Sequence, residues 1–298
     1  MPWIQLQIPA DPDTADQLED LLMEMGADAV SMEDAADQPL YEPDPGTTPL
    51  WSQTTVTGLF QCDRDIDQLC ADIRDAWHQQ AQQSLPEIGV ILVEDKDWER
   101  AWMDDFQPLK FGERLWIVPS WHDAPDPEAA NLMLDPGLAF GTGTHPTTAL
   151  CLEWLDGQDV QGKQVIDYGC GSGILGLAAL LLGADHVIGV DTDPQALAAS
   201  RDNARRNGVE QSRLDLYLPE DEPDTRCDVM LANILAQPLI GLASHLATLT
   251  RPGGDLVLSG ILSNQAREVM AAYEPWFIMD EPEQREEWIR LTGRRKDR

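Results

Sequence analysis

One segment limits the possible folds of this chain more than any other: a glycine-rich turn that joins an apolar strand to an apolar helix. The turn occupies residues 168–173, with glycine at positions 169, 171 and 173, and the apolar run Ile174–Leu182 follows it. Glycines let the backbone turn sharply and come close to a ligand, because no side chain stands in the way. The helix that follows points its N-terminus at the same place. The segment therefore indicates an α/β fold with a ligand-binding turn after its first buried strand.

Strands and helices alternate along the whole C-terminal part of the chain. The helix predicted from Pro194 to Asn207 has Asp193 in the N-cap position and Gly208 just past its end, as helix termini prefer. Such a succession produces a mostly parallel sheet that helices cover on both faces. Residues 126–298 are therefore predicted to form one domain around a sheet of seven strands: Gln164–Tyr168, His186–Val190, Leu214–Leu218, Asp228–Ala232, Asp255–Ser259, Phe277–Met279 and Trp288–Thr292.

The first 95 residues are predicted to form a smaller α+β domain. Ile4, Leu6 and Ile8 recur at every second position, which is the period of a strand with one buried face. Apolar residues at positions 18, 21, 22 and 25 then follow the spacing of a helix. Later signals complete the order β-α-β-β-α-β, which matches a ferredoxin-like fold. Residues 96–125, rich in tryptophan and charge, are expected to connect the two domains.

Acidic residues dominate the charge of the molecule. The sequence holds 53 Asp and Glu against 20 Lys and Arg, a formal net charge of −33. In the first 90 residues the only cations are Arg64 and Arg74. Direct binding of nucleic acid is not expected, because proteins that grip its backbone present basic surfaces. A basic protein partner suits the charge better, although a solvated acidic shell would give the same composition.

The cysteines and the N-terminus exclude several classes of protein. Five cysteines without a C-x-x-C pair indicate neither a disulfide framework nor a zinc site, so no metal is expected. The first ten residues lack the basic start and apolar core of a signal peptide. The longest run of apolar residues and glycines, Ile174–Ala184, is too short for a membrane helix. We therefore expect a cytoplasmic protein.

An acidic residue is placed to bind a ribose. Asp191 follows the second strand of the C-terminal domain, and a carboxylate there can accept hydrogen bonds from both ribose hydroxyls. Two cofactors fit this arrangement. The G-x-G-x-x-G pattern of residues 171–176 satisfies the dinucleotide fingerprint of a nicotinamide-dependent oxidoreductase. The D-x-G-x-G-x-G pattern of residues 167–173 equally satisfies the loop of methyltransferases that use S-adenosylmethionine, so the loop alone leaves both cofactors open.

Two further segments offer polar side chains to the same site. Asn233 follows the strand Asp228–Ala232 at the carboxyl edge of the sheet, where ligands bind in open α/β folds. Its amide carbonyl can accept a hydrogen bond from an amine and orient the lone pair, and the alternative role is that of a helix N-cap. Residues 135–148, rich in glycine and hydroxyl groups, can lie over a bound cofactor, whereas His145 among them is expected to be structural.

Five stretches of the sequence are diagnostic when they are taken together. They are DPGLAFGTGTHPTT (135–148), IDYGCGSGILG (166–176), IGVDTDPQALAAS (188–200), LANILAQPL (231–239) and PGGDLVLSGIL (252–262). These stretches resemble the bacterial PrmA family, whose members methylate the ribosomal stalk-base protein of the large subunit. Residues 1–5 and 94–121 are similar to the same family, so the resemblance covers both predicted domains.

The resemblance implies a Rossmann-like, class I methyltransferase that uses S-adenosylmethionine. Members of the family transfer methyl groups to the N-terminal α-amine and to lysine ε-amines of the ribosomal protein, up to trimethylation. Residues 1–95 would recognise the protein substrate, and the connector would let it be presented in more than one orientation. Carried onto this sequence, the cofactor-binding residues are Thr148, Gly169, Gly171, Asp191 and Asn233.

The expected roles of these residues follow from the resemblance and from their chemistry. Asp191 is predicted to hold the ribose and Asn233 to orient the amine, with no dedicated general base. The acidic first domain agrees with a basic ribosomal protein as partner, and we expect a monomer. Two alternatives stay open: a related methyltransferase that acts on another protein or a small amine, and a nicotinamide-dependent oxidoreductase.

Overall fold

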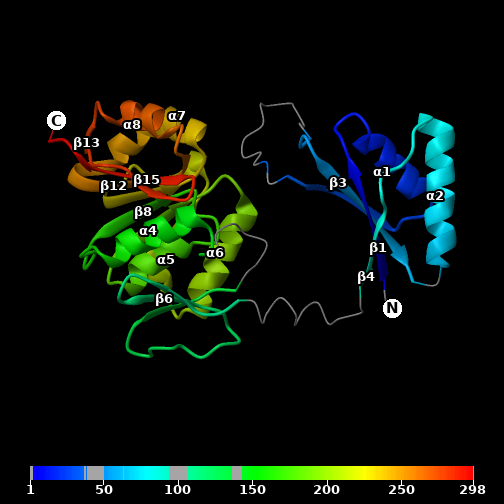
Figure 1. The fold of residues 1–298 in the computed structure, drawn as a ribbon. Helices are drawn as coiled ribbons and strands as arrows, with labels where there is room; N and C mark the ends of the chain where they lie inside the picture. The colour runs from blue at the N-terminus through cyan, green and yellow to red at the C-terminus, as the bar shows by residue number, and fades with distance from the viewer. Residues whose placement is uncertain are drawn as a thin grey trace. The chain divides into compact units, whose positions relative to one another are not determined.

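The computed structural model describes residues 3–36, 38, 50–62, 64–93, 106–135 and 143–297. The chain divides into two compact units, Met1–Met103 and Asp104–Arg298, and each is described by itself (Figure 1). Residues 96–105 of the predicted connector and residues 136–142 of the glycine-rich loop lie outside the described residues.

In its described residues the N-terminal unit is a four-stranded antiparallel sheet with two helices. In chain order its elements are β1 (Trp3–Ala10), α1 (Ala15–Glu24), β2 (Ala29–Asp34), β3 (Thr54–Gln61), α2 (Ile66–Ala81) and β4 (Gly89–Val93). The strands lie in the order β2-β3-β1-β4. The element order β-α-β-β-α-β is the one that the sequence predicts, and the assignment to the ferredoxin-like fold stays a prediction.

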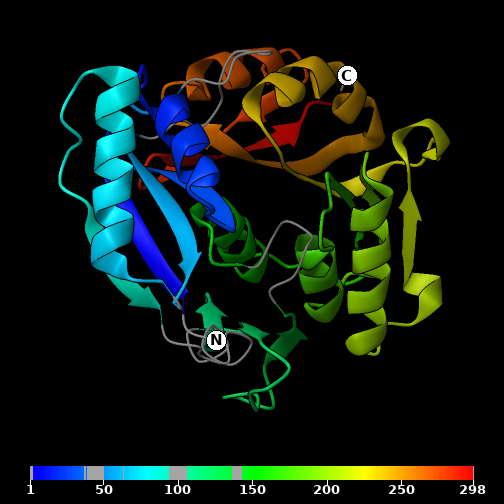
Figure 2. The same ribbon diagram turned by 90° about the vertical axis from the view of Figure 1, so that its right-hand side faces the viewer.

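The alternating pattern of β1 builds the core of this unit. Ile4, Leu6 and Ile8 are fully buried on one face of the sheet, where they pack with apolar residues of α1 and α2. Figure 2 shows both helices on that side of the sheet. The start of α2 is fixed by Asp65, whose side chain accepts a hydrogen bond from the backbone N–H of Gln68 at 3.1 Å, the usual arrangement at a helix N-cap.

The C-terminal unit is built on an eight-stranded mixed sheet. Its strands are β8 (Gln164–Tyr168), β9 (His186–Val190), β10 (Leu214–Tyr217), β11 (Cys227–Asn233), β12 (Thr250–Leu262), β13 (Phe277–Met279), β14 (Glu283–Arg285) and β15 (Trp288–Arg295). The order across the sheet is β10-β9-β8-β11-β12-β15-β13, and β14 pairs with β15. The first five of these strands are parallel, and β15 is antiparallel to its neighbours.

The predicted number of strands is wrong by one. All seven predicted strands are present, and β14 is the additional one. Its sequence, Glu-Gln-Arg, is polar throughout, so it lacks the alternation of apolar and polar residues from which a strand is predicted. Pairing with β15 is what makes these three residues extended.

Helices cover both faces of this sheet, as the sequence predicts. They are α4 (Pro146–Asp156), α5 (Ile174–Leu181), α6 (Pro194–Arg206), α7 (Ala236–Leu249) and α8 (Ala266–Tyr273). One hydrophobic core joins α4 and α5 to one face, and a second core joins α7 and α8 to the other. In Figure 1, α7 and α8 lie above the sheet, while α4 and α5 lie below it.

A small three-stranded sheet precedes α4. It consists of β5 (Leu109–Phe111), β6 (Leu115–Val118) and β7 (Ala130–Met133), in that order. Phe111, Leu115 and Leu132 are buried in the core that α4 and α5 share. The described part of the predicted connector therefore contributes two strands to the C-terminal unit.

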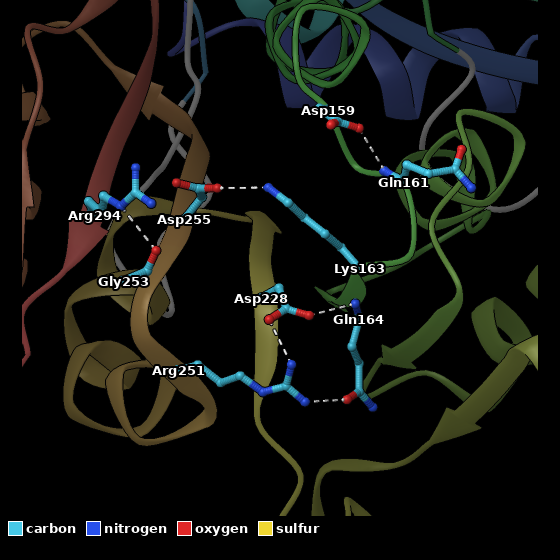
Figure 3. A network of polar contacts seen from close by, with 9 residues as sticks. All are labelled: Asp159, Gln161, Lys163, Gln164, Asp228, Arg251, Gly253, Asp255 and Arg294. Carbon is cyan, nitrogen blue, oxygen red and sulfur yellow. Dashed lines mark hydrogen bonds and ion pairs between the residues drawn. The ribbon is translucent and has the colours of Figure 1, made fainter.

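Polar contacts tie the central strands together at the amino edge of the sheet (Figure 3). The Arg251 guanidinium at the start of β12 lies 2.7 Å from Oδ1 of Asp228 in β11 and 3.1 Å from Oε1 of Gln164 in β8. The backbone N–H of Gln164 also donates to Asp228 Oδ2 at 2.9 Å. Lys163 forms a further ion pair with Asp255 at 3.4 Å. This network fixes the edge of the sheet opposite to its carboxyl ends.

The strand order creates a switch point between β8 and β11. From β8 the chain continues outward through β9 to β10, and it then returns to β11 and β12 on the other side. The loops that leave β8 and β11 therefore diverge at the carboxyl edge. In open α/β sheets this is the place where ligands bind.

Candidate functional site

The glycine loop between β8 and α5 adopts a backbone that other residues avoid. Gly169, Gly171 and Gly173 have φ values of +78°, +53° and +80°, in the left-handed region that L-residues with a Cβ rarely enter. The N–H of Gly169 donates to the carbonyl of Val190 at the end of β9, at 2.7 Å. The loop is thereby held against the next strand at the carboxyl edge.

Asp191 meets this loop from the end of β9. Its Oδ2 accepts a hydrogen bond from the N–H of Gly171 at 2.8 Å, and its Oδ1 accepts one from the N–H of Asp193 at 3.0 Å. The sequence predicts Asp191 and Gly171 at one site, and the structure brings them together. A carboxylate oxygen can accept two hydrogen bonds, so both oxygens retain the capacity to accept a hydroxyl.

Asn233 and Thr148 are also neighbours, although 85 positions separate them. Asn233 ends β11, and its Nδ2 donates to Oγ1 of Thr148 at 3.2 Å. Thr148 is buried in the first turn of α4. Asn233 does not cap α7, because the N-cap position belongs to Leu235 and no side chain caps that helix. The amide at the carboxyl edge is therefore available for another role.

His145 has a structural position. It is the N-cap of α4, where its Nδ1 accepts from the backbone N–H of Thr147 at 3.3 Å and lies 2.7 Å from the Thr147 hydroxyl. Its ring packs edge-on against Trp288, with 4.8 Å between the ring centres. Burial lowers the pKa of His145. A capping and packing role agrees with the expectation from the sequence.

Asp167 supports the glycine loop, and the sequence pattern does not reveal this role. The side chain is fully buried, and its Oδ2 accepts the N–H of Gly176 in α5 at 2.9 Å. Burial raises the pKa of Asp167 to about 7; the charge of Asp191 adds to this effect, and the hydrogen bond from Gly176 opposes it. Asp167 thus links the end of β8 to the first turns of α5.

The glycine that completes the dinucleotide pattern has a packing reason. A Cβ on Gly176 would lie 2.8 Å from Cγ1 of Val187 in β9 and 3.3 Å from Oδ2 of Asp167. The helix can approach the sheet this closely only because position 176 has no side chain. Gly176 therefore carries no independent information about a nicotinamide cofactor.

Two polar residues of α6 donate hydrogen bonds to carbonyl groups of the glycine loop. The Ser200 hydroxyl donates to the carbonyl of Gly171 at 2.8 Å, and Asn203 Nδ2 donates to the carbonyl of Ser172 at 2.9 Å. Ser200 is completely buried. Sequence reasoning missed both residues, because polar residues three positions apart on an amphipathic helix are common and signal no site.

The described part of the chain shows no sign of a metal site or a membrane segment. None of its groups of His, Cys, Asp and Glu side chains is arranged to hold a metal ion. In the same residues no helix has the length and apolar character that crossing a bilayer requires.

Comparisons with known proteins agree on one family. The sequence model of the family described as "Ribosomal protein L11 methyltransferase (PrmA)" matches residues 2–296. A protein of that name from Marinobacter nauticus is 89% identical over 297 residues, which covers 100% of each chain. Another, from Pseudomonas aeruginosa strain LESB58, is 58% identical over 296 residues, which covers 99% of each chain.

A solved structure gives the same result for about two thirds of the chain. The chain is similar to the crystal structure of a ribosomal protein L11 methylase from Lactobacillus delbrueckii subsp. bulgaricus, with 34% sequence identity and a TM-score of 0.58. The match covers 64% of this chain and 100% of the other.

Proposed function

The chain belongs to the ribosomal protein L11 methyltransferase (PrmA) family, and from that membership we propose that it methylates ribosomal protein L11 with S-adenosyl-L-methionine as methyl donor. The observation that carries this proposal is the extent of the match, which runs from residue 2 to residue 296. The resemblance inferred from the sequence motifs is thereby confirmed. The alternatives, a methyltransferase for other amines and a nicotinamide-dependent oxidoreductase, are not favoured.

The residues at the carboxyl edge fit the proposed cofactor. Asp191 offers carboxylate oxygens for the two ribose hydroxyls, and Gly169 and Gly171 expose backbone where the amino-acid part would pass. Thr148 and Asn233 offer a hydroxyl and an amide on the other side of the switch point. Nothing in this set requires a pyrophosphate or a metal.

The mechanism depends on how these residues treat the acceptor amine. When bound, S-adenosylmethionine supplies a methyl group that is already activated on a positively charged sulfur. A free lysine amine has a pKa of about 10.4 and an α-amine about 7.7–8.0, and only the neutral amine is a nucleophile. Asn233, held by Thr148, accepts a hydrogen bond from the amine through its carbonyl oxygen and so directs the lone pair. Desolvation beside the positive charge that the cofactor would supply would lower the amine's pKa, so the amine would lose its proton to water before it attacks, and no general base is assigned.

The acceptors are the N-terminal α-amine and lysine ε-amines of L11. Residues 1–95, which lie within the N-terminal unit, recognise that protein, and their many acidic side chains attract a basic partner. The connector of residues 96–125 lets the bound L11 be presented in more than one orientation, so that different amines of L11 reach the same site. The enzyme works as a monomer in the cytoplasm and makes no direct contact with nucleic acid.

Ligand binding and substrate choice test the proposal together. S-adenosylhomocysteine at about 100 times its Kd stabilises the folded state by about 2.7 kcal/mol, so it should raise the unfolding temperature, whereas NAD should not. Methyl transfer should then occur to unmethylated L11 and not to another basic ribosomal protein of similar size. Stabilisation by NAD alone would support the oxidoreductase, and equal labelling of both proteins would remove the assigned substrate.

A further inference from the structure

Ile234 lies between two glycines that belong to the neighbouring chain segments on either side of it. In the sheet β11 lies between β8 and β12, and Ile234 directly follows the last residue of β11. Gly169 follows the end of β8, and Gly260 lies in β12 next to Ser259, which pairs with Asn233. We call Gly169, Ile234 and Gly260 the Ile234 clamp.

Both contacts of the clamp require glycine. A Cβ on Gly169 would overlap Cγ2 of Ile234. A Cβ on Gly260 would overlap the carbonyl oxygen of Ile234 and would lie 2.8 Å from its carbonyl carbon and 3.1 Å from its amide nitrogen. One glycine therefore receives the side chain of Ile234, and the other receives its backbone.

The two glycines also carry an unusual backbone. Gly169 and Gly260 have φ values of +78° and +82°. The pairing of β12 with β15 shifts register between Leu258 and Ile261, so Gly260 lies within an irregularity of the strand. Such bulges often redirect a residue beside a functional site, and glycine inside a strand usually marks the close approach of another backbone.

We propose that Ile234 is a positioning residue, which fixes the backbone of Asn233 so that its amide meets the acceptor amine in one orientation. The inference rests on the proposed role of Asn233. The peptide bond that joins the two residues transmits any movement of Ile234 to Asn233 within one residue. On its other side the Asn233 amide is fixed by Thr148 at 3.2 Å, so the clamp and the threonine together determine where its carbonyl oxygen points.

Substitution of Gly260 tests the clamp without replacing any of the cofactor-binding residues. Gly260→Ala places a methyl group against the Ile234 backbone. Gly253→Ala is the matched control, because Gly253 lies on the same strand with a φ of +72° and a Cβ there would meet nothing within 4 Å. Both variants carry a similar backbone strain, and Gly260→Ala should lose more thermal stability because its Cβ also meets the Ile234 backbone. Only Gly260→Ala should lower kcat for L11 methylation, by roughly 10- to 100-fold, because small misplacements at a reacting centre have effects of this size.

Affinity for S-adenosylhomocysteine separates positioning from damage to the site. It should fall far less than kcat in Gly260→Ala, since Gly171 and Asp191, which hold the ribose side of the site, lie outside the clamp. The double variant Asn233→Ala/Gly260→Ala should be no slower than Asn233→Ala alone, because the clamp acts through the amide that is already absent. Equal kcat values in Gly260→Ala and Gly253→Ala, or a further loss in the double variant, would overturn the inference.

A second pair of variants covers the case in which Gly260→Ala does not fold. Ile234→Val keeps the Cγ2 that lies over Gly169 and should retain kcat, whereas Ile234→Ala removes it and should lower kcat. Equal activity of these two variants would contradict the clamp. Failure of the wild-type chain to methylate L11 would instead refute the proposed function, and full activity of Asn233→Ala would refute the role of Asn233 and the clamp with it.

Discussion

Asp191 shows how one side chain can organise a loop and still be available to a ligand. Its two oxygens each accept one backbone N–H, from Gly171 and from Asp193, so the carboxylate is fixed before a cofactor arrives. A preorganised acceptor loses little conformational entropy on binding. The position of Asp191 after β9 could be predicted from the sequence. Its hydrogen bond to the glycine loop could not, because it depends on the distance between two adjacent strand ends.

Removal of this carboxylate should weaken cofactor binding. A hydrogen bond to a charged group contributes about 1.5–3 kcal/mol, so Asp191→Ala should raise the Kd of S-adenosylhomocysteine roughly 10- to 100-fold. Titration calorimetry measures the change. Asp202→Ala, which removes an exposed carboxylate from α6, is the control and should bind like wild type. An unchanged Kd in Asp191→Ala would refute the ribose-binding role.

The buried carboxyl of Asp167 should make folding stability depend on pH. Burial raises its pKa from 3.8 to about 7 in the folded chain, so the folded state binds the proton more tightly than the unfolded state. The stabilisation is complete below about pH 4 and is lost as the pH rises through about 7. Asp167→Asn stays neutral throughout and should not share this loss.

Denaturant unfolding of wild type and Asp167→Asn at several pH values tests this linkage. Relative to the variant, wild type should lose stability between about pH 4 and pH 7, by an amount of the order of 4 kcal/mol. Above that range the difference should level off. A difference that does not change with pH would mean that Asp167 has an ordinary pKa in the folded protein.

At the scale of elements, the sequence predicts the helices and strands that have a local residue pattern, and it misses strands that form only by pairing with a neighbour. The helix α6 begins at Pro194 as predicted, because Asp193 caps it and accepts the N–H of Gln195 at 2.8 Å. The strand β14 was missed because its polar residues are extended only through β15. The sheet of β5, β6 and β7 was missed for a different reason: its strands are three or four residues long, too short to show a period. In the site, residues on strand ends were predictable, whereas Ser200 and Asn203 were not.

The polar network at the amino edge should support the sheet without affecting the site. Arg251 pairs with Asp228 and Gln164 across three strands, but its side chain is 46% exposed, so solvent weakens the pair. Arg251→Ala should lower the free energy of unfolding by about 1 kcal/mol and leave the Kd of S-adenosylhomocysteine unchanged.

Arg205→Ala is the matched control for this prediction. Arg205 forms an ion pair within α6 and is 72% exposed, so its loss should cost less than that of Arg251. Thermal or denaturant unfolding of both variants provides the comparison. A larger loss in Arg205→Ala, or weaker cofactor binding in Arg251→Ala, would contradict a purely structural network.

At the scale of the whole molecule, the net charge of −33 should act on a basic protein substrate more than on the fold of the site. Part of this charge forms an exposed acidic face on α1, made of Asp16, Glu19, Asp20 and Glu24. A field of one sign raises the rate of encounter with a partner of opposite charge. Salt shortens its range, since the Debye length falls from about 30 Å at 0.01 M to about 3 Å at 1 M.

Neutralisation of this face should weaken recognition of L11 and spare the chemistry. A variant with Asn or Gln at the four positions should have a higher KM for L11 at low salt, an unchanged Kd for S-adenosylhomocysteine, and a smaller dependence of KM on salt. The control neutralises four exposed acids of the C-terminal unit instead: Asp123, Glu128, Glu210 and Glu268. The same rise in KM in both variants would mean that total charge, and not the N-terminal unit, attracts the substrate.

The central claim is that this chain methylates ribosomal protein L11 at the carboxyl edge of its larger sheet. The most direct measurement is the intact mass of unmethylated L11 after incubation with the enzyme and S-adenosylmethionine. The account predicts that the mass rises in successive methyl steps with wild type, and far more slowly with Asn233→Ala. An unchanged mass with wild type, while S-adenosylhomocysteine still binds, would contradict the assigned substrate and leave only the methyltransferase fold.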